Sequence, residues 1–194
     1  MSESISLGWN CSSATYGVQH QLRTTKKNGY KTCPFDEMIT NYQGIVQCFL
    51  DNFQYLCDTK YLEIIQIDKS SKYLNTNGDG DMIIYNKKYN FLFNHESPGH
   101  ANLYNIQGWT KGINHYVMDN YSEFIQRYNR RIENIQELLH SDKFIHFILS
   151  RPNTDASTTF SASSRSASEL CSYAERSYIH DIHSRMTFLN DFKK

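Results

Sequence analysis

The chain has 194 residues, of which 20 are Lys or Arg and 20 are Asp or Glu, so its formal net charge is zero. This length suffices for one domain with a substantial hydrophobic core. The balanced charge offers no basic surface for nucleic acid or for an anionic membrane, and we expect neither as a partner. The N-terminus lacks the apolar core of a signal peptide, and no stretch approaches the ~20 apolar residues of a membrane span. We therefore expect a single cytoplasmic domain over residues 1–194.

The first predicted elements are a short strand and a helix that a glycine turn connects. Ile5 and Leu7 are the apolar positions of the strand, and Gly8 provides the turn. The helix is predicted from apolar residues four positions apart on one face, at Ala14, Val18 and Leu22.

Cys11 stands where this helix begins. Asn10 is a good N-cap residue, which would make Cys11 the first helical residue. A thiol there lies near unpaired backbone N–H groups and the positive end of the helix dipole, and both favour the nucleophilic thiolate. The same N–H groups can bind a developing oxyanion. The alternative is that Cys11 is a small buried core residue, as many free cysteines are.

The remaining elements follow from hydrophobic periodicity and turn signals. Helices are predicted over 45–53, about 120–140 and about 168–190, strands over 62–67, 82–85, 89–94 and 144–149, and a Ser-rich loop over 153–168. In the helix at 120–140, Arg127, Arg130 and Arg131 are expected on the solvent-exposed face. These elements predict an α+β fold.

Two stretches resemble metal sites only weakly. Residues 75–81 carry oxygen side chains at alternate positions, but an EF-hand loop would begin with Asp and end with Glu, where this chain has Asn75 and Asn86. His180 and His183 lie three residues apart without a third ligand nearby. The five cysteines, at 11, 33, 48, 57 and 171, contain no Cys-x-x-Cys pair. We expect neither a metal nor another cofactor.

His95 is the predicted general base. Of the eight histidines, it ends an apolar strand just before a loop with Pro98 and Gly99, where a side chain can reach a cleft. Histidine suits this role because its pKa lies near neutrality. The alternative is a histidine at a strand end with no partner.

Five motifs in order resemble a family described as putative papain-like cysteine peptidases. They are Ser6-Leu7-Gly8-Trp9-Asn10-Cys11, Cys33-Pro34-Phe35-Asp36-Glu37, Phe93-Asn94-His95-Glu96, Tyr128-Asn129-Arg130-Arg131-Ile132-Glu133 and Phe147-Ile148-Leu149-Ser150-Arg151. The resemblance spans about residues 5–151. It implies a papain-like domain with its core over this span, in which the N-terminal helix packs on a small, mostly antiparallel sheet. The family pattern has Trp where this chain has Glu37, and Asp where it has Glu96. We expect neither departure to touch Cys11 or His95.

The third catalytic member, which would orient His95, is sought among carboxylates and amides. Asp36 is the first candidate because it follows the Pro-Phe corner, with a turn or helix cap as the alternative reading. Papain-like folds often place this residue after the histidine, where Asn105, Asn114 and Asp119 stand. The oxyanion hole is expected to include the Cys11 backbone N–H, and Asn10 is a candidate second donor.

The expected activity is thiol-dependent hydrolysis of peptide or isopeptide bonds in a protein or peptide substrate. Cys11 would attack and His95 would take and return the proton, without a metal. Amidase, transglutaminase-like or acyltransferase chemistry on the same two residues is one alternative. A non-catalytic binding module that presents the abundant Tyr and Phe side chains is another.

Overall fold

The structure, a computed structural model, describes residues 2–8, 11–66, 82–100, 109–111 and 114–149. The strands are β1 (Ser2–Ser6), β2 (Leu62–Gln66), β3 (Met82–Asn86), β4 (Phe91–Phe93) and β5 (Phe144–Ile148). The helices are α1 (Ser12–Gln19), α2 (Tyr42–Leu50), α3 (Asn114–Val117) and α4 (Ser122–Leu139), with 3-10 helices η1 (Lys26–Asn28), η2 (Pro34–Glu37) and η3 (Thr59–Tyr61). The mixture is that of an α+β protein. Several predictions fall outside the described residues. They are the Ser-rich loop, the C-terminal helix, the oxygen-rich stretch 75–81, and the residues Asn105, His180 and His183.

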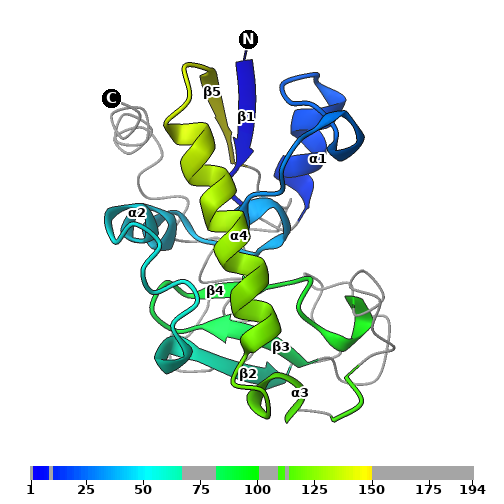
Figure 1. The fold of residues 1–194 in the computed structure, drawn as a ribbon, viewed down its shortest axis with the longest axis vertical. Helices are drawn as coiled ribbons and strands as arrows, with labels where there is room; N and C mark the ends of the chain where they lie inside the picture. The colour runs from blue at the N-terminus through cyan, green and yellow to red at the C-terminus, as the bar shows by residue number, and fades with distance from the viewer. Residues whose placement is uncertain (1, 9–10, 67–81, 101–108, 112–113, 150–194) are drawn as a thin grey trace, which may run out of the picture.

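Two small sheets form the β structure. β1 and β5 pair in parallel, and β2, β3 and β4 form an antiparallel sheet in that order. In Figure 1 these two sheets lie toward opposite ends of the molecule, and α4 runs past both. No helix among the described residues has the length and apolar character to cross a bilayer.

The predicted strands 82–85 and 89–94 correspond to β3 and β4, which form a hairpin, and one side chain accounts for its turn. Asn86 ends β3, and its Oδ1 accepts hydrogen bonds from the backbone N–H groups of Lys88 and Tyr89, at 2.9 and 3.0 Å. Its Nδ2 donates to the Tyr55 carbonyl at 2.8 Å. Because Asn86 is fully buried, these bonds both close the turn and tie it to the preceding segment.

Helix α1 packs on the parallel pair β1 and β5, whereas the sequence led us to expect a mostly antiparallel sheet beneath it. The helix buries only small residues, Ser13, Ala14 and Gly17. A Cβ atom on Gly17 would lie 2.6 Å from Ser4 Oγ. Glycine at this position therefore allows the close approach of α1 to the sheet.

Aromatic side chains connect α4 to the antiparallel sheet. The Phe93 ring on β4 makes edge contacts with Phe124 and Tyr128 of α4, each with centroids 4.8 Å apart. On the same helix Arg131, predicted to face solvent, is buried, with a side chain only 6% exposed. In β5, the strand predicted over 144–149, the first residue Phe144 is exposed.

Candidate active site

The turn from β1 to α1 is fixed by side chains around Gly8. Gly8 has φ +104°, and a Cβ there would lie 2.1 Å from Thr40 Oγ1, so no other residue fits without rearrangement. Thr40 Oγ1 donates to the Leu7 carbonyl at 2.5 Å, and Ser13 Oγ donates to the Gly8 carbonyl at 2.7 Å. The predicted glycine turn therefore leads directly to the head of α1.

Cys11 is the N-cap residue of α1, whereas the sequence predicted it as the first helical residue, so the helix begins one residue later than expected. The side chain of Cys11 is exposed. Its carbonyl accepts the first helical hydrogen bond, from Thr15 N at 2.8 Å. Asn10 lies outside the described residues. A hydrogen bond from His95 lowers the pKa of Cys11, against the effect of burial, and the positive charge of His95 and the backbone N–H of Cys11 lower it further. The structure thus brings the two predicted residues together as a bonded pair.

The other described thiols lie in environments of the opposite kind. Burial raises the pKa of Cys33 and of Cys48 well above the ordinary value, and raises that of Cys57 to about 12. Among the four cysteines that the structure describes, Cys11 alone is exposed and has a lowered pKa. Of these four thiols, Cys11 is the one whose surroundings favour the thiolate.

His95 follows β4 by two residues and is held in place by its neighbour Glu96. The Glu96 side chain is completely buried and accepts two hydrogen bonds from Arg127 Nη1, both of 2.7 Å, and one from the Tyr116 hydroxyl, of 2.6 Å. The backbone N–H of Glu96 also bonds to the Phe93 carbonyl at 2.8 Å. Glu96 therefore anchors the backbone that presents His95.

The imidazole of His95 lies between the thiol and a carboxylate. Its Nδ1 is 3.4 Å from Glu37 Oε2, which leaves Nε2 as the nitrogen for Cys11. Burial alone would lower the pKa of His95, but the hydrogen bond with Cys11 and the contact with the negatively charged Glu37 raise it to about 9. The ring also stacks on His100, with centroids 4.7 Å apart and planes 13° apart. The lowered pKa of Cys11 and the raised pKa of His95 both favour the ion pair of thiolate and imidazolium over the neutral pair.

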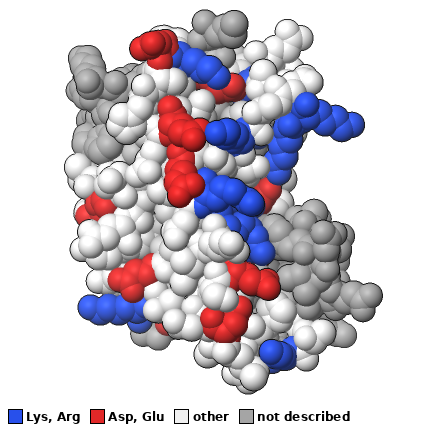
Figure 2. All heavy atoms as spheres, in the orientation of Figure 1, with Lys and Arg blue, Asp and Glu red and all other residues white. Residues whose placement is uncertain are grey.

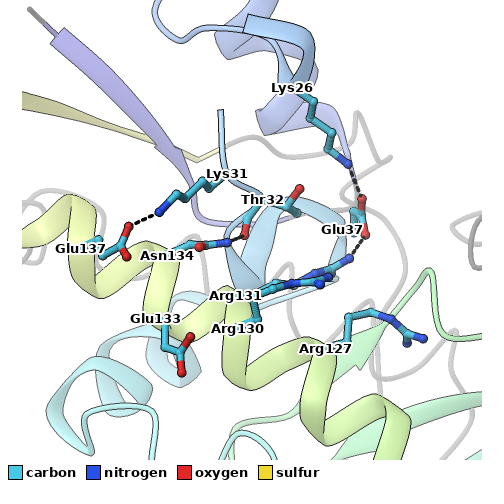
Figure 3. A pocket seen from close by; sticks show the side chains of 10 residues that line it. All are labelled: Lys26, Lys31, Thr32, Glu37, Arg127, Arg130, Arg131, Glu133, Asn134 and Glu137. Atoms are coloured by element: carbon cyan, nitrogen blue, oxygen red, sulfur yellow. Dashed lines mark hydrogen bonds and ion pairs between the residues drawn. The ribbon is translucent and has the colours of Figure 1, made fainter. Parts of the chain in front are cut away.

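Glu37 is the site residue that the sequence did not predict. Besides His95 it contacts Arg131 Nη2 at 2.6 Å and Lys26 Nζ at 3.3 Å. Burial alone would raise its pKa, but His95, Arg131 and Lys26 hold the pKa well below the ordinary value. Figure 3 shows Lys26 and Arg131 reaching this carboxylate from two different elements. The expectation that Glu37 would not touch His95 was wrong. The sequence feature that could have indicated Glu37 is its place as a second acid directly after Pro34-Phe35-Asp36.

Asp36 does not make the contact expected of it. Its Oδ1 accepts from Arg23 Nη1 at 2.8 Å, and its Oδ2 caps η2 by accepting from the Cys33 backbone N–H at 2.9 Å. These contacts match the alternative reading of Asp36 as a cap. Of the later candidates, Asp119 bonds to Ser122 Oγ, and neither it nor Asn114 bonds to His95 among the described residues.

A cavity of about 340 Å³ opens beside the thiol. It is lined by Cys11, Ala14, Thr15, Val18, Gln19, Arg23, Thr25, Lys26, Asp36, Glu37 and His95. The outer face of α1 forms one side, and the segment that carries Arg23 and Lys26 forms another. No group of three His, Cys, Asp or Glu side chains in the described part of the chain is arranged to hold a metal ion.

An α+β scaffold that presents a cysteine at a helix head to a histidine backed by a carboxylate has the parts of a thiol-dependent hydrolase. The chain belongs to the family described as putative papain-like cysteine peptidase (DUF1796), whose family model matches residues 2–177. The resemblance predicted from the five motifs is thus confirmed and extends beyond residue 151. No curated protein and no solved structure matches the chain.

Proposed function

We propose that this protein is a cysteine peptidase that hydrolyses peptide or isopeptide bonds with Cys11 as nucleophile and His95 as acid and base. The observation that supports this most is the continuous contact from the exposed Cys11 thiol through His95 to Glu37. The raised pKa of His95 and the lowered pKa of Cys11 favour a thiolate–imidazolium pair near neutral pH. Such a pair combines a nucleophile with a proton donor in one site.

The reaction would begin when the Cys11 thiolate attacks the scissile carbonyl carbon. As the C–S bond forms, the carbonyl electron pair moves to oxygen, where the backbone N–H of Cys11 can stabilise it. We propose the side chain of Asn10 as the second donor. When the tetrahedral intermediate collapses, the C–N bond breaks and the His95 imidazolium gives its proton to the leaving amine. Water, deprotonated by His95, then hydrolyses the thioester and regenerates the thiol.

Glu37, rather than Asp36, would be the positioning residue for His95. Its carboxylate faces Nδ1, so it fixes the tautomer that presents Nε2 to the thiol, and it stabilises the imidazolium. Arg131 keeps this carboxylate ionised and oriented, because its guanidinium is buried against it. Asp36 instead stabilises η2, the 3-10 helix on which Glu37 stands, through its bonds to Arg23 and Cys33.

The proposal is tested with a diverse peptide library and mass-spectrometric detection of products. The wild-type protein should cleave a subset of peptides, and Cys11→Ala and His95→Ala should each abolish cleavage while the fold persists. Cys57→Ala, which changes a half-buried thiol outside the cavity, is the matched control and should cleave normally. Added amines separate hydrolysis from acyl transfer, because a transferase forms the amide product. Cleavage that persists in Cys11→Ala would overturn the proposal.

A further inference from the structure

Lys26 is the most solvent-exposed charged group that touches the site. Its side chain is 62% exposed, whereas those of Glu37, Arg131 and His95 are 13%, 6% and 14% exposed. Its contact with Glu37, at 3.3 Å, is also longer than the 2.6 Å contact of Arg131. An exposed ion pair of this kind contributes little to stability and exchanges readily. The ammonium group of Lys26 is therefore available to a ligand, while the guanidinium group of Arg131 is not.

The charges around Glu37 do not balance. In the thiolate–imidazolium form the anions are Cys11 and Glu37, and the cations that contact Glu37 are His95, Arg131 and Lys26. The cluster therefore carries one excess positive charge. The other cation of the cavity, Arg23, cannot supply this excess, because it is buried and paired with Asp36.

Lys26 also borders a second hollow on the far side of Glu37. This groove, of about 740 Å³, is lined by Lys26, Lys31, Thr32, Glu37, Arg127, Arg130, Arg131, Glu133, Asn134 and Glu137. Among the described residues neither Arg130 nor Glu133 forms an ion pair, so these two add one charge of each sign to the groove. Figure 2 shows basic and acidic side chains side by side over α4 on this face. The excess positive charge beside the thiol is therefore that of Lys26 and not of the groove.

We infer that Lys26 selects substrates that carry a carboxylate next to the scissile bond, so that the substrate class is an acidic peptide. This inference rests on the proposed function and deepens it. When the substrate binds, its carboxylate takes the Lys26 ammonium from Glu37, which keeps Arg131 and His95 as partners. The field of the cluster also raises the local concentration of such an anion.

Two small alkylating probes that differ in charge test this without a known substrate. Iodoacetate and iodoacetamide react alike, since the thiolate forms a C–S bond and iodide leaves with the C–I electron pair. The ratio of the two rates at Cys11, mapped by mass spectrometry, reports the field at the thiol. We expect Lys26→Gln to lower the iodoacetate-to-iodoacetamide ratio ~3-fold and Lys26→Glu ~10-fold. Lys27→Gln, an exposed neighbour in η1 outside the cavity, should leave it unchanged.

Paired peptides that differ only by Asp or Asn next to the cleaved bond extend the test. The wild type should prefer Asp, and Lys26→Gln should lose this preference through KM rather than kcat. An unchanged probe ratio in both Lys26 variants, with rapid alkylation of Cys11 by iodoacetamide, would overturn the inference and leave the proposed function standing. Alkylation of Cys11 by iodoacetamide no faster than that of free cysteine would overturn both.

Discussion

Replacing Glu37 by Gln keeps the shape of the side chain and removes the charge that faces His95. At the observed 3.4 Å, one pair of unit charges interacts by ~1 kcal/mol in a water-like medium and ~5 kcal/mol at an effective dielectric constant of about 20. Both side chains are 13–14% exposed, so the site lies between these limits, and Gln can still form a hydrogen bond with Nδ1. We therefore expect a loss of about 2 kcal/mol from the ion pair of Cys11 and His95, or roughly 30-fold in thiolate population below the pKa of Cys11.

The assay is the pH dependence of iodoacetamide alkylation at Cys11. In Glu37→Gln the rate at pH 6 should fall roughly 30-fold, because the pKa of His95 falls and that of Cys11 rises, whereas at high pH the rates should converge. Asp36→Asn is the matched control, since it removes the adjacent carboxylate that binds Arg23. It should destabilise the fold by about 3 kcal/mol, because it leaves a buried guanidinium without its partner, while the alkylation profile stays close to that of wild type.

Glu37→Gln also deprives Arg131 of its carboxylate, so its folded fraction has to be measured by urea unfolding and the rates taken from folded protein only. A wild-type alkylation profile in folded Glu37→Gln, together with a shifted profile in Asp36→Asn, would refute this reasoning and return the positioning role to Asp36.

Three further predictions concern the same elements. Under limiting iodoacetamide at neutral pH, Cys11 should be labelled before Cys33, Cys48 and Cys57, and preferential labelling of any of these three would contradict the pKa directions. Because His95 has a pKa of about 9 in the folded chain and 6.5 as its ordinary value, its stabilising contribution is complete below pH 6.5 and lost as the pH rises through 9. The difference in unfolding free energy between wild type and His95→Ala should therefore shrink by on the order of 2 kcal/mol over this range, and a difference that grows with pH would be inconsistent. Gly8→Ala should lower Tm by ~5 °C or more, whereas Gly29→Ala, with a similar φ of +97° but open space around it, should cost about 1 kcal/mol, and equal effects would exclude a role for the Thr40 contact.

The parts of the fold that the sequence predicted are those that local patterns specify. The hairpin at β3 and β4 follows from two apolar runs around a polar turn, and α4 follows from its helical period. The helical period predicts that Arg131, a charged residue, faces solvent. In the structure Arg131 is buried, because its guanidinium contacts the carboxylate of Glu37. A local pattern contains no information about such a partner from another element.

For the site, the sequence indicated Cys11 and His95 because each has a local signature, a helix head and a strand end. The prediction of Asp36 as the residue that orients His95 differs from the structure, where Glu37 contacts His95. In the sequence, a capping acid and a positioning acid beside a Pro-Phe corner look alike. In the structure adjacent residues on a 3-10 helix point in different directions, so Asp36 reaches Arg23 and Glu37 reaches His95. Only the docking of β4 and α4 reveals which acid faces the imidazole.

The pairing of β1 with β5 affects when, during folding, the Cys11 thiol reaches the surroundings that lower its pKa. Ser2 to Ser6 align with Phe144 to Ile148, and the Leu7 N–H continues the ladder by bonding to the Ile148 carbonyl at 2.9 Å. During synthesis β1, which leads to Cys11, leaves the ribosome before β5, which lies near the other end of the described chain. Closing so long a loop is slow. We therefore expect nascent and partly folded chains to carry Cys11 as an ordinary thiol, which delays its reactivity until the chain has folded.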